Sequence, residues 1–327
     1  MDAELLAPHF SDADKAREYL ESKRWPDGVV CPHCGVIGEA TKLEPKEGTK
    51  THARKGVYKC GGCHEQFTVT VGTIFEDSHI PLNKWLLAFH LLCASKKGMS
   101  AHQLHRMLGI TYKSAWFMGH RIRYAMGKEP LASKLKGIVE IDETYIGGKI
   151  RFGTAPWNGG APRIIRDPRA NKAAVVSFLE RSGDVRSFHV ERVTSDNLKP
   201  ILNEMVEEGT HLMTDSTTTL KFPKNTAWKH GVVNHTKKEY ARYENGTCIS
   251  TNAVEGYFGI LKRGINGVYH HVGRHHLNQY LKEFDFRYNS RKITDGERTL
   301  LALKGSDGKR LMLKNPIKSS MNASVFL

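Results

Sequence analysis

Two CxxC motifs near the start of the sequence constrain the fold more than any other feature. Cys31-Pro-His-Cys34 and Cys60-Gly-Gly-Cys63 are separated by 25 residues. Each motif turns the chain tightly enough to direct two sulfur atoms at one ion, and four thiolates are a common ligand set for structural zinc. The spacing therefore predicts a zinc ribbon in which Zn²⁺ is bound by Cys31, Cys34, Cys60 and Cys63.

Other readings of the cysteines are weaker. Cys93 and Cys248 are isolated in the sequence and are interpreted as ordinary buried thiols. His33 and His64 adjoin the CxxC motifs, but four sulfurs already fill a tetrahedral shell. A disulfide framework is the alternative, and six cysteines in a long chain without a secretory signal argue against it. A zinc hydrolase is disfavoured as well, because a four-thiolate site leaves no position for water.

The charge is distributed unevenly along the 327 residues, a length that allows two or three domains. Residues 1–80 carry 10 Lys/Arg against 13 Asp/Glu, whereas residues 81–136 carry 10 against 1. Residues 149–172 and 256–292 each have a net charge of +5, from 6 against 1 and 7 against 2. Three separate basic blocks favour a polyanionic partner, most simply nucleic acid, over a merely solubilising surface. Without a run of 18 apolar residues or a signal peptide, we expect a soluble intracellular protein.

The first basic block predicts a helical DNA-binding domain over residues 81–136. Ser100 and Gln103 read as a capping box, Gly109 ends that helix, and Thr111 or Ser114 caps a longer basic one. A short helix, a glycine-containing turn and a basic helix make a helix-turn-helix candidate. A plain helical packing domain is the alternative. The side chains predicted to contact DNA in this block are Lys113, His120, Arg121 and Arg123.

Two aspartates then follow strand-like apolar runs. In "GIVEIDETYIGGK" Asp142 comes at the end of an apolar run that Gly147-Gly148 closes, and Glu143 points to the opposite face. Asp215 ends "THLMTDST", 73 residues later. Between them lie two more strands and a helix that begins near Ser195, in which Pro200 fits only the first turn. The two acids could meet on neighbouring strands and bind Mg²⁺ or Mn²⁺ through oxygen atoms.

A third element, "STNAVEGYFGILKRG", places an amide, a carboxylate and a cation on one helix face. At about 100° per residue, Asn252, Glu255 and Lys262 fall within an arc of roughly 80°. Gly256 and Gly259 each weaken a helix by about 1 kcal/mol. Their presence suggests that another backbone or a nucleic-acid strand passes close to the helix.

The order of these motifs resembles the ISXO-like insertion-sequence transposases of bacteria. The resemblance covers nearly the whole chain, and rests on "VEIDETYIGGK", "MTDST", "TNAVEGYFGILKRGINGVYHHV" and "HLNQYLKEFDFRYNSR". It implies an α/β, RNase H-like catalytic domain, a mixed five-stranded sheet flanked by helices. In that family two aspartates and an Asn or Glu are followed by Lys, so Asp142 and Asp215 would be the first two catalytic acids.

The third acid is assigned by spacing and chemistry. Glu255 lies seven residues before Lys262, the usual spacing in such enzymes, and a carboxylate binds a hard cation better than an amide does. Glu255 is therefore the preferred ligand and Asn252 the alternative. Two Mg²⁺ or Mn²⁺ ions would clamp the scissile phosphate, water would nick the transposon end, and the freed 3′-hydroxyl would attack target DNA. Lys262 would contact a phosphate.

The domain boundaries complete the expectation. The ribbon segment is predicted over 1–80, the helical domain over 81–136, the catalytic domain over 137–292 and a tail over 293–327. Arg263 and Arg274 are further candidates for DNA contact. The histidines at 270, 271, 275 and 276 are interpreted as DNA-facing or structural rather than as a metal site, and residues 151–172 as a mobile loop. Acting on two transposon ends favours a homodimer or higher oligomer. The alternatives are a domesticated DNA-binding protein and an RNase H-like nuclease that never joins strands.

Overall fold

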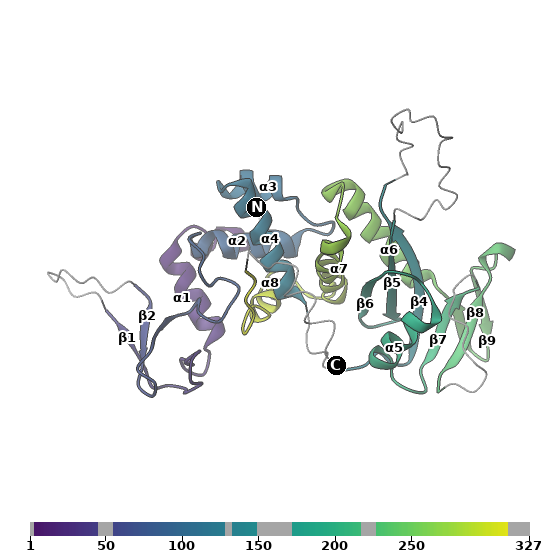
Figure 1. The fold of residues 1–327 in the computed structure, drawn as a ribbon, viewed down its shortest axis with the longest axis horizontal. Coiled ribbons are helices and arrows are strands. Elements are labelled where there is room, and N and C mark those ends of the chain that lie inside the picture. Colours follow the sequence, from purple (N-terminus) through teal and green to yellow (C-terminus); the bar gives the residue numbers. More distant parts are fainter. Residues whose placement is uncertain (1–2, 45–54, 128–132, 149–171, 217–226, 313–327) are drawn as a thin grey trace, which may run out of the picture. The chain divides into compact units, whose positions relative to one another are not determined.

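The structure, a computed structural model, describes residues 3–44, 55–127, 133–148, 172–216 and 227–312. It separates into two compact units, shown as ribbons in Figure 1. Unit 1 comprises residues 1–128 together with 290–327, and unit 2 comprises residues 129–289. The C-terminal segment predicted as a tail therefore contributes to unit 1, through helix α8.

Unit 1 contains a small antiparallel sheet that follows helix α1 (Ala13–Arg24). Asp12 caps α1 by accepting hydrogen bonds from the backbone N–H groups of Asp14 and Lys15. The sheet has the order β1-β2-β3, with bounds Ala40–Leu43, Val57–Cys60 and Gln66–Thr68. Aromatic rings from the helix end and the strands pack edge to face or stack, which gives this short sheet a core of its own.

The rest of unit 1 is helical. Two short 3₁₀ turns precede α1, at Ala3–Leu6 and Pro8–Phe10, and the longer helices are α2 (Leu82–Ala94), α3 (Ala101–Leu108), α4 (Tyr112–Met126) and α8 (Asp295–Lys304). Ser100 caps α3, Gly109 ends it in the left-handed conformation at φ 59°, and Thr111 caps α4. These helix limits agree with the pattern in the sequence. Helix α8 packs against α2 and α4.

Unit 2 is built on a mixed five-stranded sheet in the order β6-β5-β4-β7-β8 (Figure 1). Strands β4, β5 and β6 are antiparallel neighbours, whereas β4, β7 and β8 run parallel. The strand bounds are Ile138–Ile146 for β4, Ala173–Glu180 for β5, Val185–Val190 for β6, His211–Asp215 for β7 and Lys229–Val233 for β8. The mixed sheet flanked by helices is the architecture that the sequence predicted.

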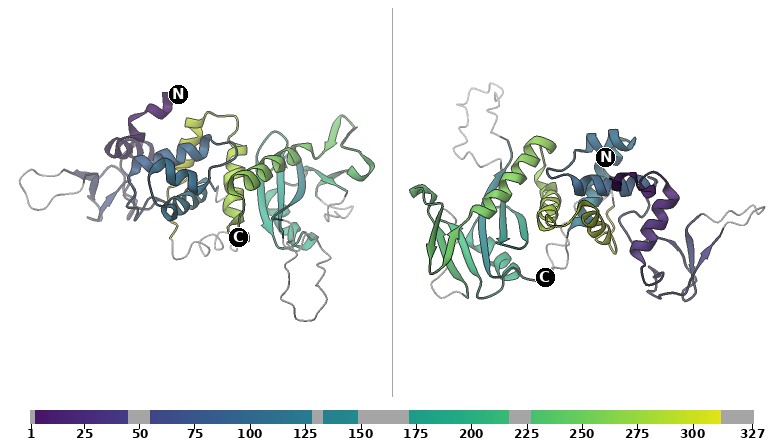
Figure 2. Two further views of the ribbon diagram at one scale, coloured as in Figure 1. Left: turned by 90° about the horizontal axis from the view of Figure 1, so that it is seen from above. Right: turned by 180° about the vertical axis from the view of Figure 1, so that it is seen from behind.

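Helices cover both faces of this sheet (Figure 2). Helix α5 (Ser195–Met205) packs on one face against Val139, Ile141 and Phe178. Helices α6 (Asn252–Gly264) and α7 (Arg274–Asn289) pack on the other face against Val175 and Leu179. A π-helical turn, Ile265–Tyr269, joins α6 to α7. Because side chains alternate along a strand, this division also decides which face of β4 each acid occupies.

A two-stranded hairpin leads from the sheet into α6. A 3₁₀ turn at His235–Lys237 precedes strands β9 (Ala241–Glu244) and β10 (Thr247–Ser250), which pair antiparallel. Ser250 and Thr251 are buried, and Thr251 directly precedes α6. The hairpin therefore fixes where the helix that carries Glu255 begins.

Two local predictions were wrong. Helix α5 begins at Ser195, so Pro200 lies in its second turn rather than its first; a proline there removes one backbone hydrogen bond, and tertiary packing of Leu198 and Leu202 outweighs the loss. Asp142 is not at a strand end, because β4 continues to Ile146 through its pairing with β5. In the part of the chain that the structure describes, no helix is long and apolar enough to cross a membrane.

Candidate functional site

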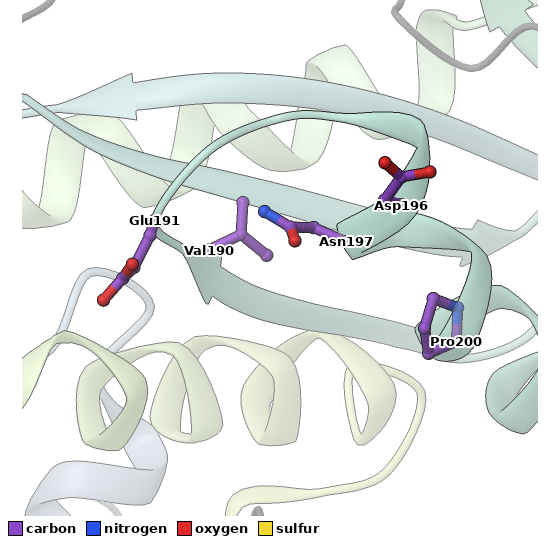
Figure 3. Close-up of a pocket in the computed structure, with 5 residues that line it drawn as sticks. All are labelled: Val190, Glu191, Asp196, Asn197 and Pro200. Atoms are coloured by element: carbon purple, nitrogen blue, oxygen red, sulfur yellow. The ribbon is translucent and has the colours of Figure 1, made fainter.

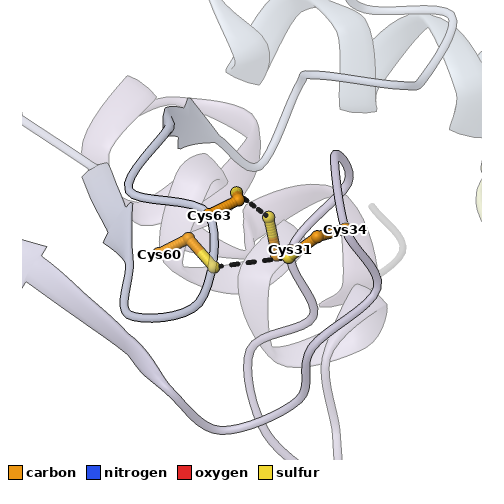
Figure 4. Close-up of side chains that lie close together, drawn as sticks. All are labelled: Cys31, Cys34, Cys60 and Cys63. Carbon is orange, nitrogen blue, oxygen red and sulfur yellow. Dashed lines mark hydrogen bonds between the residues drawn. The ribbon is translucent and has the colours of Figure 1, made fainter.

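The four cysteines of the CxxC motifs come together in unit 1, as Figure 4 shows. Their sulfur atoms all lie within 4.8 Å of one another, with 3.7 Å between Cys31 and Cys63 and 3.5 Å between Cys34 and Cys60. Tetrahedral zinc at about 2.3 Å from each sulfur requires sulfurs roughly 3.8 Å apart. The backbone N–H of Cys63 lowers the pKa of Cys60 to about 7, whereas burial and the neighbouring thiols raise the pKa values of Cys34 and Cys63. The cluster therefore suits Zn²⁺, as the sequence predicted.

In unit 2 the two aspartates lie on neighbouring parallel strands. The β4–β7 ladder pairs Ile141 with Thr214, so Asp142 and Asp215 follow at equivalent positions one residue later. Val139 and Ile141 face α5, and alternation turns Asp142 toward the face covered by α6. Glu143 consequently faces the α5 side. The parallel register of β4 and β7 therefore brings the two aspartates to adjacent positions on neighbouring strands.

Helix α6 brings a third carboxylate to the same face. Glu255 lies in its first turn, and its Oε1 is 3.1 Å from His235 Nε2. The hydroxyl of Thr251 donates to the same carboxylate oxygen at 3.3 Å and lies 3.1 Å from His235 Nε2. The Glu255 side chain remains 45% exposed, so it is oriented by two neighbours and still open to a ligand.

The electrostatics of Asp142 show that these acids are close together. Burial, and after it the carboxylates of Glu143, Glu255 and Asp215, raise the pKa of Asp142 to about 7. The backbone N–H of Glu143, 2.8 Å from Asp142 Oδ1, opposes that shift. Several carboxylates brought close together in this way offer the oxygen ligands that a divalent cation prefers.

The carboxylate oxygens are less tightly gathered than the sulfurs. Among the described residues, the cysteines are the group of three or more metal-binding side chains whose ligand atoms all lie within 4.8 Å. Asp142, Asp215 and Glu255 interact electrostatically without reaching that spacing. The donor set still fits Mg²⁺ or Mn²⁺, because both prefer carboxylate oxygens.

The other predicted residues of α6 are on its surface. Asn252 and Lys262 are both exposed, and only Glu255 of the three contributes to the pKa shift of Asp142. A Cβ atom at Gly256 would meet nothing within 4 Å, and one at Gly259 would meet only the Arg263 side chain, at 3.6 Å. Among the described residues no second backbone lies beside these glycines, and the alternative, a nucleic-acid strand, stays a prediction.

The predicted DNA-contacting residues fall into two groups. Lys113, Arg263 and Arg274 are exposed. Arg121 is only 7% exposed and its guanidinium donates to the carbonyls of Ile74, Glu76 and Leu311, and burial lowers its pKa. The structure contradicts the prediction for Arg121, and for the equally buried Arg123 and His120, because these side chains pack into unit 1 instead of facing a ligand.

Two further surface features do not belong to the acid cluster. A shallow depression of about 410 Å³ at the start of α5 is lined by Val190, Glu191, Asp196, Asn197 and Pro200, and none of the predicted acids borders it (Figure 3). In the described part of the chain, the histidines at 270, 271, 275 and 276 form no group with metal-binding spacing. The predicted loop at 151–172 lies outside the described residues except for Lys172.

Three side chains beside the acids were missed from the sequence. His235 contacts Glu255. Glu140, two residues before Asp142 on β4, forms an ion pair with Arg181. Glu140 had a signal, since a carboxylate inside an apolar strand needs a partner and the i, i+2 spacing puts it on the face of Asp142. For His235 and Arg181 the sequence carries no comparable signal.

Comparison with known proteins connects both sites to one family. The profile described as an ISXO2-like transposase domain matches residues 134–289, and that of a transposase zinc-ribbon domain matches residues 11–66. The chain is also 25% identical over 284 residues to an "uncharacterized protein in transposable element ISH50" of Halobacterium salinarum, an alignment that covers 85% of this chain and 91% of that protein. The matched regions contain the three acids and the four cysteines described above. The chain therefore carries an ISXO2-like transposase domain and, before it, a transposase zinc ribbon.

Proposed function

We propose that this transposase cuts the ends of its insertion sequence and joins the freed 3′-hydroxyl groups to target DNA, using an RNase H-like catalytic domain. The observation that carries the proposal is the approach of Asp142, Asp215 and Glu255 on the α6 face of the sheet, where Asp142 and Asp215 occupy equivalent positions of neighbouring parallel strands. Such a cluster is poised to bind divalent cations and unsuited to a purely structural role, because it would destabilise the fold without them.

The roles of the side chains follow from their positions. Asp142, Asp215 and Glu255 would bind Mg²⁺ or Mn²⁺, which activates a water or hydroxyl nucleophile and stabilises the leaving oxygen in phosphoryl transfer. Thr251 and His235 hold the Glu255 carboxylate in place through contacts of 3.3 Å and 3.1 Å. Lys262, exposed on the same helix, would contact a DNA phosphate as a point charge. Asn252 remains the alternative third ligand.

DNA would be held by surfaces on both units. In unit 1 the exposed N-terminus of α4, with Lys113, follows the turn after α3 in the order typical of a helix-turn-helix. In unit 2, Arg263 and Arg274 are the exposed candidates near α6 and α7. Processing two transposon ends would require a dimer or higher oligomer. The ribbon would bind Zn²⁺ as a structural ion.

A cleavage and joining assay tests the proposal. Full-length, zinc-loaded protein is mixed with labelled duplexes from both flanks of the gene, with a target plasmid, and with or without Mg²⁺. We expect joined products only with Mg²⁺, and a loss of at least about 100-fold, or roughly 2.7 kcal/mol in barrier, in Asp142→Asn and Glu255→Gln. Glu143→Gln, which alters the neighbouring acid on the opposite face, is the matched control and should change the rate much less.

Each other outcome assigns a different function. Cleavage without joining would identify a nuclease. Binding of the flanking DNA without cleavage would identify a DNA-binding protein. A full rate in Glu255→Gln together with a loss in Asn252→Ala would move the third ligand to Asn252.

A further inference from the structure

Helix α6 begins without a side-chain hydrogen bond from its own N-cap residue. Thr251 occupies the N-cap position, but its hydroxyl contacts Glu255 and His235 and makes no capping hydrogen bond. The first backbone N–H groups of a helix have no partner within the helix and need an external acceptor. Here Thr251 is fully buried, so water is a poor substitute and another side chain must fill the role.

That acceptor is Glu140 of strand β4. Its Oε2 accepts hydrogen bonds from the backbone N–H groups of Ala253 at 2.8 Å and Val254 at 3.0 Å. Glu140 is 1% exposed and lies two residues before Asp142, on the same face of the sheet. A carboxylate is well suited to a helix N-terminus, where the backbone dipoles concentrate positive charge.

Arg181, the residue that follows strand β5, binds the other oxygen of the Glu140 carboxylate. Its Nε and Nη2 donate to Glu140 Oε1 at 2.9 Å and 2.8 Å. Its Nη1 donates to the carbonyl of Cys248 at 2.7 Å, and Nη2 also donates to Ser250 Oγ at 3.0 Å. Both of those residues belong to β10, which leads into α6. Glu140 and Arg181 therefore hold the start of α6 from the strand side and from the hairpin side.

We infer that Glu140 and Arg181 are a positioning pair, which sets the distance between Glu255 and Asp142 and thereby the affinity of the acid cluster for divalent cations. The connection is short and stiff: one residue separates Asp142 from Glu140 along β4, a hydrogen bond links Glu140 to Val254, and Glu255 is next in sequence. The inference rests on the proposed function and extends it to two residues that would touch neither DNA nor metal.

Glu140 is not itself placed to be a further metal ligand. Oε1 is engaged by Arg181, and Oε2 by the two amides of α6. A cation bound there would have to displace a guanidinium and uncap the helix. Side chains that orient metal ligands in this indirect way typically change metal affinity by about 10- to 100-fold when they are altered.

The test measures Mn²⁺ binding directly, by calorimetry on DNA-free, zinc-loaded full-length protein, with Asp142→Ala as the blank for other sites. We expect Glu140→Gln to bind Mn²⁺ about 10-fold more weakly at this site. We expect Arg181→Lys, which keeps the charge but loses the forked contacts, to do the same to a smaller degree. Exchange of the amides of Ala253 and Val254 with deuterium should become faster in both variants.

Leu202→Ala is the control for general destabilisation. Leu202 is 1% exposed in the cluster on the opposite, α5 face of the sheet, so its truncation weakens unit 2 without touching α6. This variant should melt earlier and still bind Mn²⁺ within about twofold of the wild type. If Glu140→Gln fails to fold, the Mn²⁺ affinity of Arg181→Lys decides the test instead.

The outcomes separate this inference from the proposed function. If wild type binds no more Mn²⁺ than Asp142→Ala, both are overturned. If wild type binds Mn²⁺ and Glu140→Gln or Arg181→Lys binds it equally well, the proposed function stands and the positioning pair is refuted. A loss in Leu202→Ala equal to that in Glu140→Gln also refutes it, because the effect is then one of stability alone.

Discussion

Replacing Asp142 by asparagine should make the magnesium-free protein more stable at alkaline pH. Asp142 has a pKa raised to about 7, primarily by burial and then by the carboxylates of Glu143, Glu255 and Asp215. Ionisation of this side chain in the folded state is therefore opposed by its surroundings. Asparagine has nearly the same shape and cannot ionise, so the substitution removes the unfavourable charge.

The magnitude follows from the pKa. Between the ordinary value of 3.8 and about 7 the folded chain binds more protons than the unfolded chain, so stability falls as the pH rises through that window. The full shift corresponds to roughly 4 kcal/mol at pH 8, and partial exposure of Asp142 reduces it to about 2 kcal/mol. For a unit of this size the expected gain in melting temperature is about 4–8 °C.

Scanning calorimetry at several pH values measures this difference. The buffer should lack Mg²⁺ and contain no chelator, so that the ribbon keeps its zinc. Asp142→Asn should melt above wild type at pH 8 and close to it at pH 4, where the aspartate is protonated in the folded state and only partly ionised in the unfolded state. Added Mg²⁺ at pH 8 should stabilise wild type more than the variant. Equal melting temperatures at pH 8, or a gap that widens toward pH 4, would refute the reasoning.

Three further predictions concern other parts of the chain. Cys60→Ser should abolish stoichiometric zinc binding, measured by metal analysis, and speed amide exchange across residues 55–72, because such ribbons fold on their metal; retained zinc would contradict this. Lys113→Ala should weaken DNA binding and reduce its salt dependence by about one charge without changing the melting temperature. Arg121→Ala should instead lower the melting temperature, because the Arg121 guanidinium donates hydrogen bonds to three carbonyls inside unit 1. Gly231→Ala should destabilise unit 2 by about 1–3 kcal/mol in calorimetry, because the new Cβ would lie 2.9 Å from atoms of Ile249 and Met213; an unchanged transition would show that the site relaxes.

Much of the acid cluster could be predicted because its determinants are local. Strand periodicity indicates which face of β4 Asp142 occupies, and the apolar run before Asp215 indicates a neighbouring strand. The paired CxxC spacing similarly predicts four sulfurs within bonding range of one ion. Helix α6 was predictable from its amphipathic pattern, which puts Tyr257 and Leu261 in the core and leaves Lys262 exposed.

What the sequence could not indicate depends on contacts between distant segments. A basic helix such as α4 does not reveal which of its arginines is buried by its own unit, and Arg121 finds carbonyls 45 to 190 residues away. Glu140 accepts from amides 113 and 114 residues further on. The placement of His235 beside Glu255 likewise depends on how the β9–β10 hairpin folds back. These partners are determined by tertiary packing, on which local periodicity carries no information.

The central claim is that Asp142, Asp215 and Glu255 form a divalent-metal centre for DNA strand transfer. Anomalous diffraction from crystals of the full chain grown with Mn²⁺ and a transposon-end duplex tests it most directly, with data collected at the manganese and zinc absorption edges. We predict manganese peaks bounded by oxygens of these three carboxylates, at about 2.0–2.6 Å, and a separate zinc peak among the four cysteine sulfurs. Manganese bound elsewhere, or at Asp142 and Asp215 with Asn252 instead of Glu255, would contradict it.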